Sequence, residues 1–230
     1  MTVSGTPEWV GRRSRERKAR VAADLLHDDQ EVELLITAAQ RILRRGGVEA
    51  VTVREVLAET SFGTRAFYRH FASRDELVMA VFVRAARREA DRLTQKMAAA
   101  GGPLEAVVAW IDGRLDLAFD RRVASSAREL SVEAQLRRRQ TPAELELAVE
   151  LMLAPLIEQL EAALSVGLLQ GVDPLRDARS VHDVVWGVIE RQWSGFAMRP
   201  QETRRHVVRF CLRALGASQH EVSARDASRG

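Results

Sequence analysis

The stretch from Thr52 to Leu77, TVREVLAETSFGTRAFYRHFASRDEL, constrains the fold more than any other part of the chain. It predicts two short helices separated by a break at Ser61 to Gly63, and a longer helix after Ser73. The second short helix begins at Thr64 and combines cationic, hydrogen-bonding and aromatic side chains. A helix, a tight turn and a second helix with such a surface form the layout of a helix-turn-helix, whose second helix enters the major groove of DNA.

Capping signals mark two helix starts in this stretch. Thr52 and Ser73 are good N-cap residues, because their hydroxyl oxygens can accept a hydrogen bond from a backbone N–H of the first turn. A glutamate follows each of them three residues later, Glu55 and Glu76, and completes a capping box. We therefore expect helices to begin directly after both residues.

Apolar residues recur at spacings of three and four along most of the chain, and we find no alternation typical of strands. The pattern predicts an all-α protein of about nine helices. Beyond the stretch above, we expect helices over residues 30–46, 104–120, 126–138, 142–169, 177–196 and 201–215. We divide the chain into a flexible basic extension (1–28), a three-helix helix-turn-helix DNA-binding domain (29–75), a ligand-binding and dimerisation domain (76–216) and a disordered tail (217–230).

Composition narrows the class of protein. Hydrophobic residues make up 46% of the chain, enough for a core, and charged residues make up 29%. No segment approaches the roughly 18 apolar residues of a membrane span, and no apolar run follows the N-terminal charges as in a secretory signal. Cys211 is the single cysteine, which excludes an internal disulfide and a cysteine-built zinc site. We expect a cytoplasmic protein without a metal or cofactor.

The net charge of +3 is too small to indicate a nucleic-acid partner, but its distribution is uneven. Between Gly11 and Arg20 the chain carries six cationic residues and one acidic residue. Such an arm can lie along DNA phosphates or enter a minor groove. The alternative is a solvated basic tail, and the sequence leaves both readings open.

Within the central stretch, each side chain suits a particular contact with DNA. Thr64 and Arg65 start the second helix and suit base edges, since arginine can bind guanine through two hydrogen bonds. Tyr68, His70 and Arg74 suit phosphate oxygens, which fix the register without reading the sequence. The alternative is an amphipathic hairpin with a charged outer face. The candidate DNA-binding residues are Thr52, Arg54, Thr64, Arg65, Phe67, Tyr68, Arg69, His70, Ser73 and Arg74.

These residues resemble the DNA-binding segment of the TetR family of transcriptional regulators, which reads roughly T-x-x-x-I-A-x-x-A-G-V-S-x-G-T-L/F-Y-x-H-F-x-S-K-E-x-L. The positions kept in register are Thr52, Val56, Phe67, Tyr68, His70, Phe71, Ser73, Arg74 in place of lysine, Asp75 in place of glutamate, and Leu77. The ending Y-x-H-F-x-S-[KR]-[DE]-x-L is specific to the family. The helical layout extends the resemblance to about residues 29–216.

The turn departs from the family pattern. Ser61-Phe62-Gly63 stands where the family has Gly-Val-Ser, and Ala66 stands where it usually has a threonine that contacts phosphate. A left-handed Ser61 would carry a strain of about 1 kcal/mol, whereas glycine in place of a serine cap costs little. We expect these changes to alter the affinity and the preferred operator sequence.

The resemblance implies a homodimer formed by the last two helices, whose two recognition helices lie about 34 Å apart on DNA. The helix over 177–196 carries two apolar stripes, so it is expected to be buried on two sides. The alternative is a simple monomer core. The candidate interface residues are Val185, Trp186, Ile189, Trp193, Val208, Cys211, Leu212 and Leu215.

The resemblance also implies a regulatory site for a small molecule among the fourth to eighth helices. The low aromatic content (5%) and the many aliphatic residues suit a small, largely apolar effector with a few polar anchors. The candidates, each of which could instead be plain core or surface, are Met97, Trp110, Arg114, Phe119, Met152 and His182.

We find no catalytic motif: no H-x-x-x-H pair, no G-x-S-x-G and no phosphate-binding loop. Asp112 and Asp116 lie four residues apart, but Arg114 and Arg121 nearby favour a solvated charged face over paired catalytic carboxylates. We therefore predict no enzyme, but a repressor that leaves a palindromic operator when an effector shifts the helix starting at Arg74. The alternatives are a helical ligand-binding dimer with only non-specific DNA affinity and an orphan helical enzyme.

Overall fold

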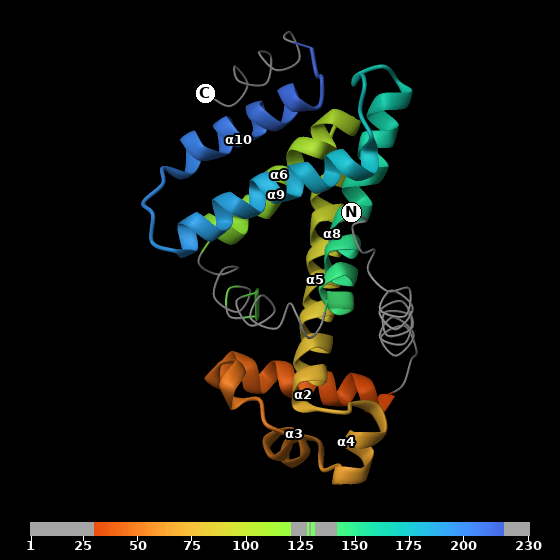
Figure 1. The fold of residues 1–230 in the computed structure, drawn as a ribbon, viewed down its shortest axis with the longest axis vertical. Helices are drawn as coiled ribbons and strands as arrows, with labels where there is room; N and C mark the ends of the chain where they lie inside the picture. Colours follow the sequence, from red (N-terminus) through yellow and green to blue (C-terminus); the bar gives the residue numbers. More distant parts are fainter. Residues whose placement is uncertain (1–29, 121–127, 129, 132–141, 219–230) are drawn as a thin grey trace, which may run out of the picture. The chain divides into compact units, whose positions relative to one another are not determined.

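The computed structural model describes residues 30–120, 128, 130–131 and 142–218, and these residues form helices and connecting turns only (Figure 1). The all-α prediction is confirmed for this part of the chain. The elements in order are α2 (Gln30–Gly46), the 3-10 helix η1 (Val48–Ala50), α3 (Val53–Thr60), α4 (Thr64–His70), α5 (Arg74–Ala98), α6 (Pro103–Phe119), α8 (Pro142–Ser165), α9 (Pro174–Trp193) and α10 (Pro200–Ala214). The basic arm, most of the helix predicted over 126–138 and most of the C-terminal tail lie outside the described residues.

The chain divides into two compact units. Unit 1 contains α2, η1, α3, α4, α5 as far as Arg87, and residues 126–150. Unit 2 contains α5 from Arg88, α6, α8 from Leu151, α9 and α10. Two of the boundaries between the units therefore fall within helices, one in α5 and one in α8.

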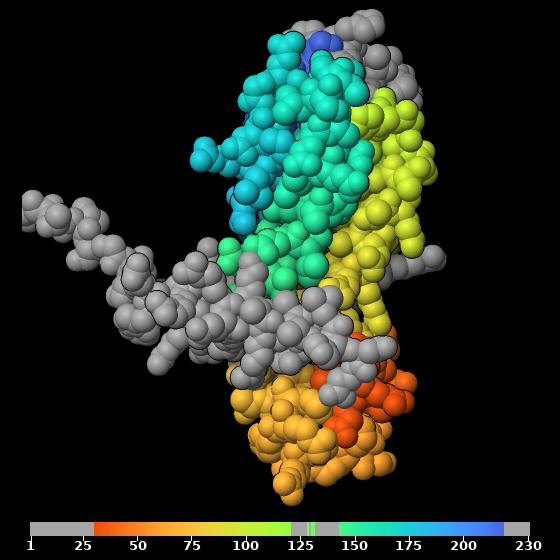
Figure 2. Space-filling model, turned by 90° about the vertical axis from the view of Figure 1, so that its right-hand side faces the viewer, coloured from red at the N-terminus to blue at the C-terminus, as the bar shows by residue number. Residues whose placement is uncertain are grey.

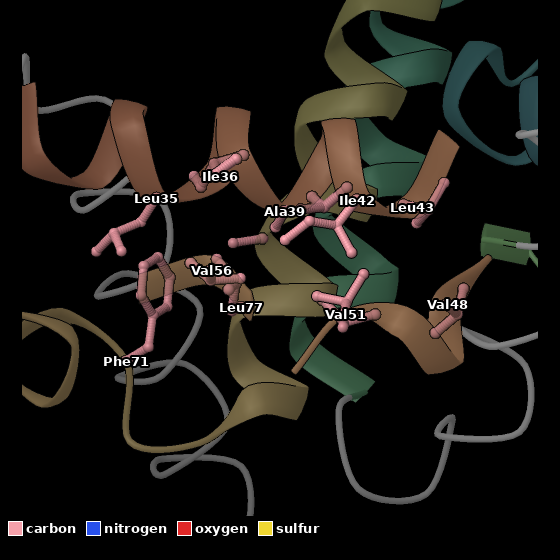
Figure 3. Close-up of a cluster of buried hydrophobic side chains, with 14 of the residues drawn as sticks. Leu35, Ile36, Ala39, Ile42, Leu43, Val48, Val51, Val56, Phe71 and Leu77 are labelled. Carbon is pink, nitrogen blue, oxygen red and sulfur yellow. The ribbon is translucent and has the colours of Figure 1, made fainter. Parts of the chain in front are cut away.

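The core of unit 1 is built from apolar side chains spaced three and four residues apart on α2. Leu35, Ile36 and Ala39 are fully buried, since this spacing places them on one helical face. Figure 3 shows this face directed toward Val56 of α3 and Leu77 of α5. In the space-filling view, α2 (red-orange) packs against the orange surface of α3 and α4 (Figure 2).

The two predicted capping boxes differ in the structure. At α3, the Glu55 N–H donates to Thr52 Oγ1 (3.2 Å), but the Glu55 carboxylate pairs with the neighbouring arginine. At α5 the Glu76 N–H donates to Ser73 Oγ (3.2 Å), and the Glu76 carboxylate accepts a hydrogen bond from the N–H of Ala72, the residue before the N-cap (2.6 Å). Two hydrogen bonds made by the side chains of Ser73 and Glu76 therefore hold the start of α5.

Unit 2 is arranged around α6, which is buried on most of its circumference and packs against both α9 and α10 (Figure 1). Helix α9 begins at Pro174, three residues before the predicted start at Asp177. Asp173 explains this difference, because its Oδ1 accepts a hydrogen bond from the Arg176 N–H (3.1 Å) and proline suits the first helical position. Helix α8 continues through Pro155. Among the described helices, none is long and apolar enough to cross a membrane.

Candidate functional site

The turn between α3 and α4 positions the predicted recognition helix. Ser61 has φ 57° and ψ 19°, so it lies in the left-handed region, the case for which we expect strain. Gly63 is the N-cap of α4, with φ −83° and no side chain to bond the first turn. The sharp reversal is therefore made by a serine in a conformation that favours glycine.

Phe67 anchors α4 to the core of unit 1. Its side chain is fully buried, and its ring lies 5.9 Å from that of Phe71 and 5.2 Å from that of Tyr68. Phe67 was among the predicted DNA-contacting residues, but in the structure its side chain packs α4 against the core of unit 1. Because Phe67 is buried, the opposite side of α4 is the one exposed to solvent.

The open side of α4 carries the predicted polar and aromatic residues. Thr64, Arg65, Tyr68 and Arg69 are all exposed, and Tyr68 keeps 56% of its surface accessible. Spacings of one, three and four residues place them on one side of the helix. No ion pair joins Arg65 to another described residue. This side therefore presents one phenol, one hydroxyl and two guanidinium groups to solvent.

Glu31, in the first turn of α2, holds the last turn of α4. Its Oε2 pairs with Arg69 Nη1 (3.1 Å) and with His70 Nε2 (2.8 Å). The His70 side chain is only 12% exposed, so its ring is directed into this contact and not toward solvent. The sequence pattern predicted a phosphate contact for His70. It carries no local signal for the contact with Glu31, which lies 39 residues away along the chain.

Arg74, the first residue of α5, joins the start of this helix to the segment before α3. Its Nε donates to the Val51 carbonyl (2.8 Å) and its Nη2 to the Val48 carbonyl (2.6 Å). The guanidinium predicted to bind phosphate thus satisfies two backbone carbonyls at η1. Ser73 and Thr52 likewise use their hydroxyl oxygens as helix caps.

A second arginine, Arg84, ties α5 to α2 within unit 1. Its guanidinium bonds Glu33 Oε2 (2.7 Å), Thr37 Oγ1 (2.9 Å) and Gln40 Oε1 (2.9 Å). The sequence carries no local signal for this contact, because the partners lie more than 40 residues away along the chain. Seven of the ten predicted DNA-binding residues are exposed, namely Thr52, Arg54, Thr64, Arg65, Tyr68, Arg69 and Ser73, and two of these, Thr52 and Ser73, act as helix caps.

In unit 2, three of the six predicted effector residues come together. Trp110 of α6 is fully buried and its Nε1–H donates to the carbonyl of Met152 on α8 (3.1 Å). The His182 ring of α9 lies 6.5 Å from the Trp110 ring and stacks on Trp186 at 6.3 Å. Met97 is buried, and Phe119 is half-buried beneath the guanidinium of Arg204 (5.5 Å).

Two polar side chains near this cluster are buried. Arg114 is 2% exposed and reaches Glu89 Oε1 through Nη1 at 3.4 Å. Burial lowers the pKa of Arg114, and Glu89 partly opposes this effect. Burial, with the charges of Arg114 and Arg179, lowers the pKa of His182 to about 4. His182 is therefore neutral at pH 7.

Asp112 and Asp116 do not lie on the solvated charged face that we had predicted. Asp116 bonds Arg204 Nη2 (2.7 Å) through Oδ1 and Lys96 Nζ (3.0 Å) through Oδ2, and its side chain is 21% exposed. Burial alone would raise the pKa of Asp116, but the bonds from Arg204 and Lys96 hold it below its usual value. Instead of a solvated face, the two aspartates belong to a half-buried ion-pair network that links α5, α6 and α10.

Most of the predicted interface residues are buried within the chain itself. Trp186 and Trp193 are half-buried, and Trp193 Nε1–H donates to the Leu117 carbonyl (3.0 Å). The largest exposed apolar side chain of α10 is Phe210, at 51%. The fully covered residues are Val185, Ile189, Val208, Cys211, Leu212 and Leu215. Burial also raises the pKa of the Cys211 thiol to about 12.

Comparison with known proteins agrees with the fold and with the sequence pattern. Residues 35–81 match the family model described as bacterial regulatory proteins, tetR family, which confirms the resemblance seen in the sequence. No protein of curated function matches the chain in sequence. Solved structures share the fold at low sequence identity, among them three with 20% identity or less.

The first, RolR in complex with resorcinol, has 18% identity and a TM-score of 0.63 over 84% of this chain and 91% of that chain. A TetR-family transcriptional regulator from Mesorhizobium loti has 20% identity and a TM-score of 0.61 over 82% and 98% of the two chains. A transcriptional regulator from Saccharomonospora viridis in complex with choline has 14% identity and a TM-score of 0.62 over 82% and 98%.

Proposed function

We propose that this chain, with the fold of TetR-family regulators and their sequence pattern over residues 35–81, is a DNA-binding transcriptional regulator. The observation that carries the proposal is the open side of α4, where Thr64, Arg65 and Tyr68 are exposed together while Phe67 anchors the opposite side. A short helix that is packed against the core on one face and carries exposed polar side chains on the other is suited to the major groove.

Each exposed residue has a role set by its chemistry. Arg65, near the helix start and without an ion-pair partner among the described residues, is suited to read guanine through two hydrogen bonds. Tyr68 and Arg69 are suited to phosphate oxygens, as is Arg54, whose side chain is 88% exposed. His70, Ser73 and Arg74 support the site by holding α4 and α5 in place.

The regulator acts as a homodimer on a palindromic operator. A single α4 reads only a few base pairs, so two copies about 34 Å apart supply the specificity that one lacks. We place the partner against α9 and α10. The residues open to it are the half-buried Trp186 and Trp193 and the exposed Phe210.

A small effector controls this binding in our proposal. RolR binds resorcinol and the Saccharomonospora viridis regulator binds choline. We place the corresponding site of this chain at Trp110, Met152 and His182. The effector releases the repressor only if it binds more tightly to the dimer whose α4 helices no longer match the grooves.

Selection of bound duplexes from a randomised DNA library, followed by fluorescence anisotropy on the selected sequence, tests DNA recognition. Arg65→Ala is expected to lose about 1–3 kcal/mol of binding free energy and to relax specificity at one base pair. Tyr68→Ala is expected to weaken all sequences alike. Arg199→Ala, an 89% exposed arginine in unit 2, is the control and should bind like the parent.

Recovery of no consensus sequence, or full binding by both α4 variants, would reject the assignment. The departures at Ser61, Gly63 and Ala66 favour one rival, a helical ligand-binding dimer with only non-specific DNA affinity. In that case unlabelled random DNA would compete equally, and affinity would fall steeply with salt.

A further inference from the structure

Nε of Arg114 and Nδ1 of His182 are among the buried polar atoms of unit 2 that have no hydrogen-bond partner within the described part of the chain. Both side chains are more than nine-tenths buried, at 2% and 8% exposure. Buried polar atoms are nearly always paired, so an unpaired one requires an explanation such as a role in binding. Two such atoms on helices that pack against each other, α6 and α9, suggest a shared ligand.

The surroundings of these atoms are aromatic. Trp110 precedes Arg114 by one helical turn on α6, so the two side chains share a face, and the Trp110 ring is 6.5 Å from that of His182. The Trp110 N–H is already used by the Met152 carbonyl. The indole therefore offers a ligand only apolar contact, while hydrogen bonding falls to Arg114 and His182.

The charge of Arg114 is incompletely balanced. Its carboxylate partner among the described residues, Glu89, contacts it at 3.4 Å, yet both Glu89 oxygens also accept bonds from Arg92 at 2.8 and 2.9 Å. One carboxylate thus serves two guanidinium groups. A buried charge is costly unless it is fully paired, so a second anion beside Arg114 would be stabilised. Burial is the main cause of the lowered pKa values of Arg114 and His182, and neighbouring guanidinium groups, Arg92 for the first and Arg114 with Arg179 for the second, lower them further.

We infer that the effector of this protein is a small organic carboxylate, whose oxygens bind Arg114 Nε–H and His182 Nδ1–H and whose apolar or aromatic body lies against Trp110. This inference rests on the proposed function and specifies the chemical class of its ligand. The same charge disfavours a cationic ligand, which distinguishes this chain from the choline-binding regulator of the same fold.

Binding of three carboxylates, benzoate, phenylacetate and hexanoate, to the full-length protein without DNA tests the inference. The primary amides of the same acids are neutral controls of similar shape, and choline is the cationic control. Isothermal titration calorimetry at pH 7 is expected to show at least one carboxylate binding about tenfold or more tightly than its amide, as a charge-assisted hydrogen bond implies. Equal binding of each acid and its amide, binding of none, or preferred binding of choline would overturn the inference.

Two variants locate the site. Arg114→Gln removes the charge and is expected to bring the carboxylate-to-amide affinity ratio close to one, and His182→Phe keeps a ring but loses Nδ1 and should lower the ratio severalfold. Arg179→Gln is the matched control, because Arg179 also acts on His182 electrostatically but is exposed. Circular dichroism melting establishes that each variant is folded. If Arg114→Gln does not fold, the carboxylate-to-amide affinity ratio of His182→Phe tests the inference by itself. An unchanged ratio in the folded variants would place the carboxylate elsewhere.

The inference and the proposed function can fail separately. A protein that binds its selected operator but no carboxylate would retain the regulatory function and lose only the ligand class. A protein that binds carboxylates through Arg114 but selects no operator would retain the ligand site and lose the regulatory function.

Discussion

Ser61 is the only non-glycine residue with a positive φ within the described part of the chain, at 57°. A left-handed conformation strains a residue with a Cβ, whereas glycine adopts it freely. Ser61→Gly is therefore expected to raise the free energy of unfolding by about 0.5–1 kcal/mol, after the larger entropy of glycine in the unfolded chain is subtracted. Urea denaturation measures this change.

Ser61→Ala provides the control for this prediction, because it removes the hydroxyl but keeps the Cβ. The alanine variant should not be stabilised. If both variants were equally stable, the strain would not reside in the backbone conformation.

His182 makes stability depend on pH. Its pKa is lowered to about 4 by burial and by the charges of Arg114 and Arg179, so between pH 6.5 and 4 the unfolded chain binds a proton that the folded chain does not. Stability therefore falls as pH decreases through this range, with a contribution from His182 of about 2 kcal/mol between pH 7 and 5. Denaturant unfolding of the parent and of His182→Phe at both pH values measures it. The variant should lose this part of the pH dependence, and an identical dependence in both proteins would contradict the lowered pKa.

At the scale of elements, Gly113 allows α6 to approach the C-terminal half of α5. A Cβ at this position would lie 2.6 Å from Leu93 Cδ2 and 3.3 Å from Lys96 Cδ, and Leu93 is fully buried. Gly113→Ala gains about 1 kcal/mol of helix propensity, but overpacking costs about 1–3 kcal/mol. We expect a lower melting temperature, measured by circular dichroism.

A double-mutant cycle with Leu93→Ala tests the cause of this effect. In the Leu93→Ala background the clashing methyl group is absent, so Gly113→Ala should be neutral or stabilising. A loss of the same size in both backgrounds would mean that the close approach of α6 to Leu93 is not responsible.

At the scale of the whole molecule, the proposed dimer must cover apolar side chains that the single chain leaves exposed. Phe210, 51% exposed on α10, is the clearest of them, and Phe210→Lys is expected to shift the protein from dimer to monomer at micromolar concentration. Sedimentation velocity measures the shift. Operator affinity should fall in parallel, because two half-sites are no longer bound together.

Val166→Lys is the matched control for the dimer prediction. Val166 follows α8 and is 65% exposed, so it is an apolar surface residue outside α9 and α10. It should leave the sedimentation coefficient unchanged. Equal dissociation by both variants, or by neither, would remove Phe210 from the interface.

The sequence by itself determined the helical class, the position of the helix-turn-helix and the residues on the outer side of α4. These features depend on local interactions, namely the apolar period, N-caps such as Thr52 and the glycines and prolines at helix ends, so they can be recognised in short stretches. Thr64, Arg65 and Tyr68 were predicted in this way and are exposed in the structure.

Only the tertiary structure decided how the remaining polar residues are used. Arg74 and His70 looked like phosphate ligands but bind the Val48 and Val51 carbonyls and Glu31. Arg114 looked like part of a solvated face but is buried. Their partners lie tens of residues away and are brought near by helix packing, which depends on how whole apolar faces fit together. A spacing pattern specifies which face of a helix is buried, but it does not specify which distant side chain that face meets.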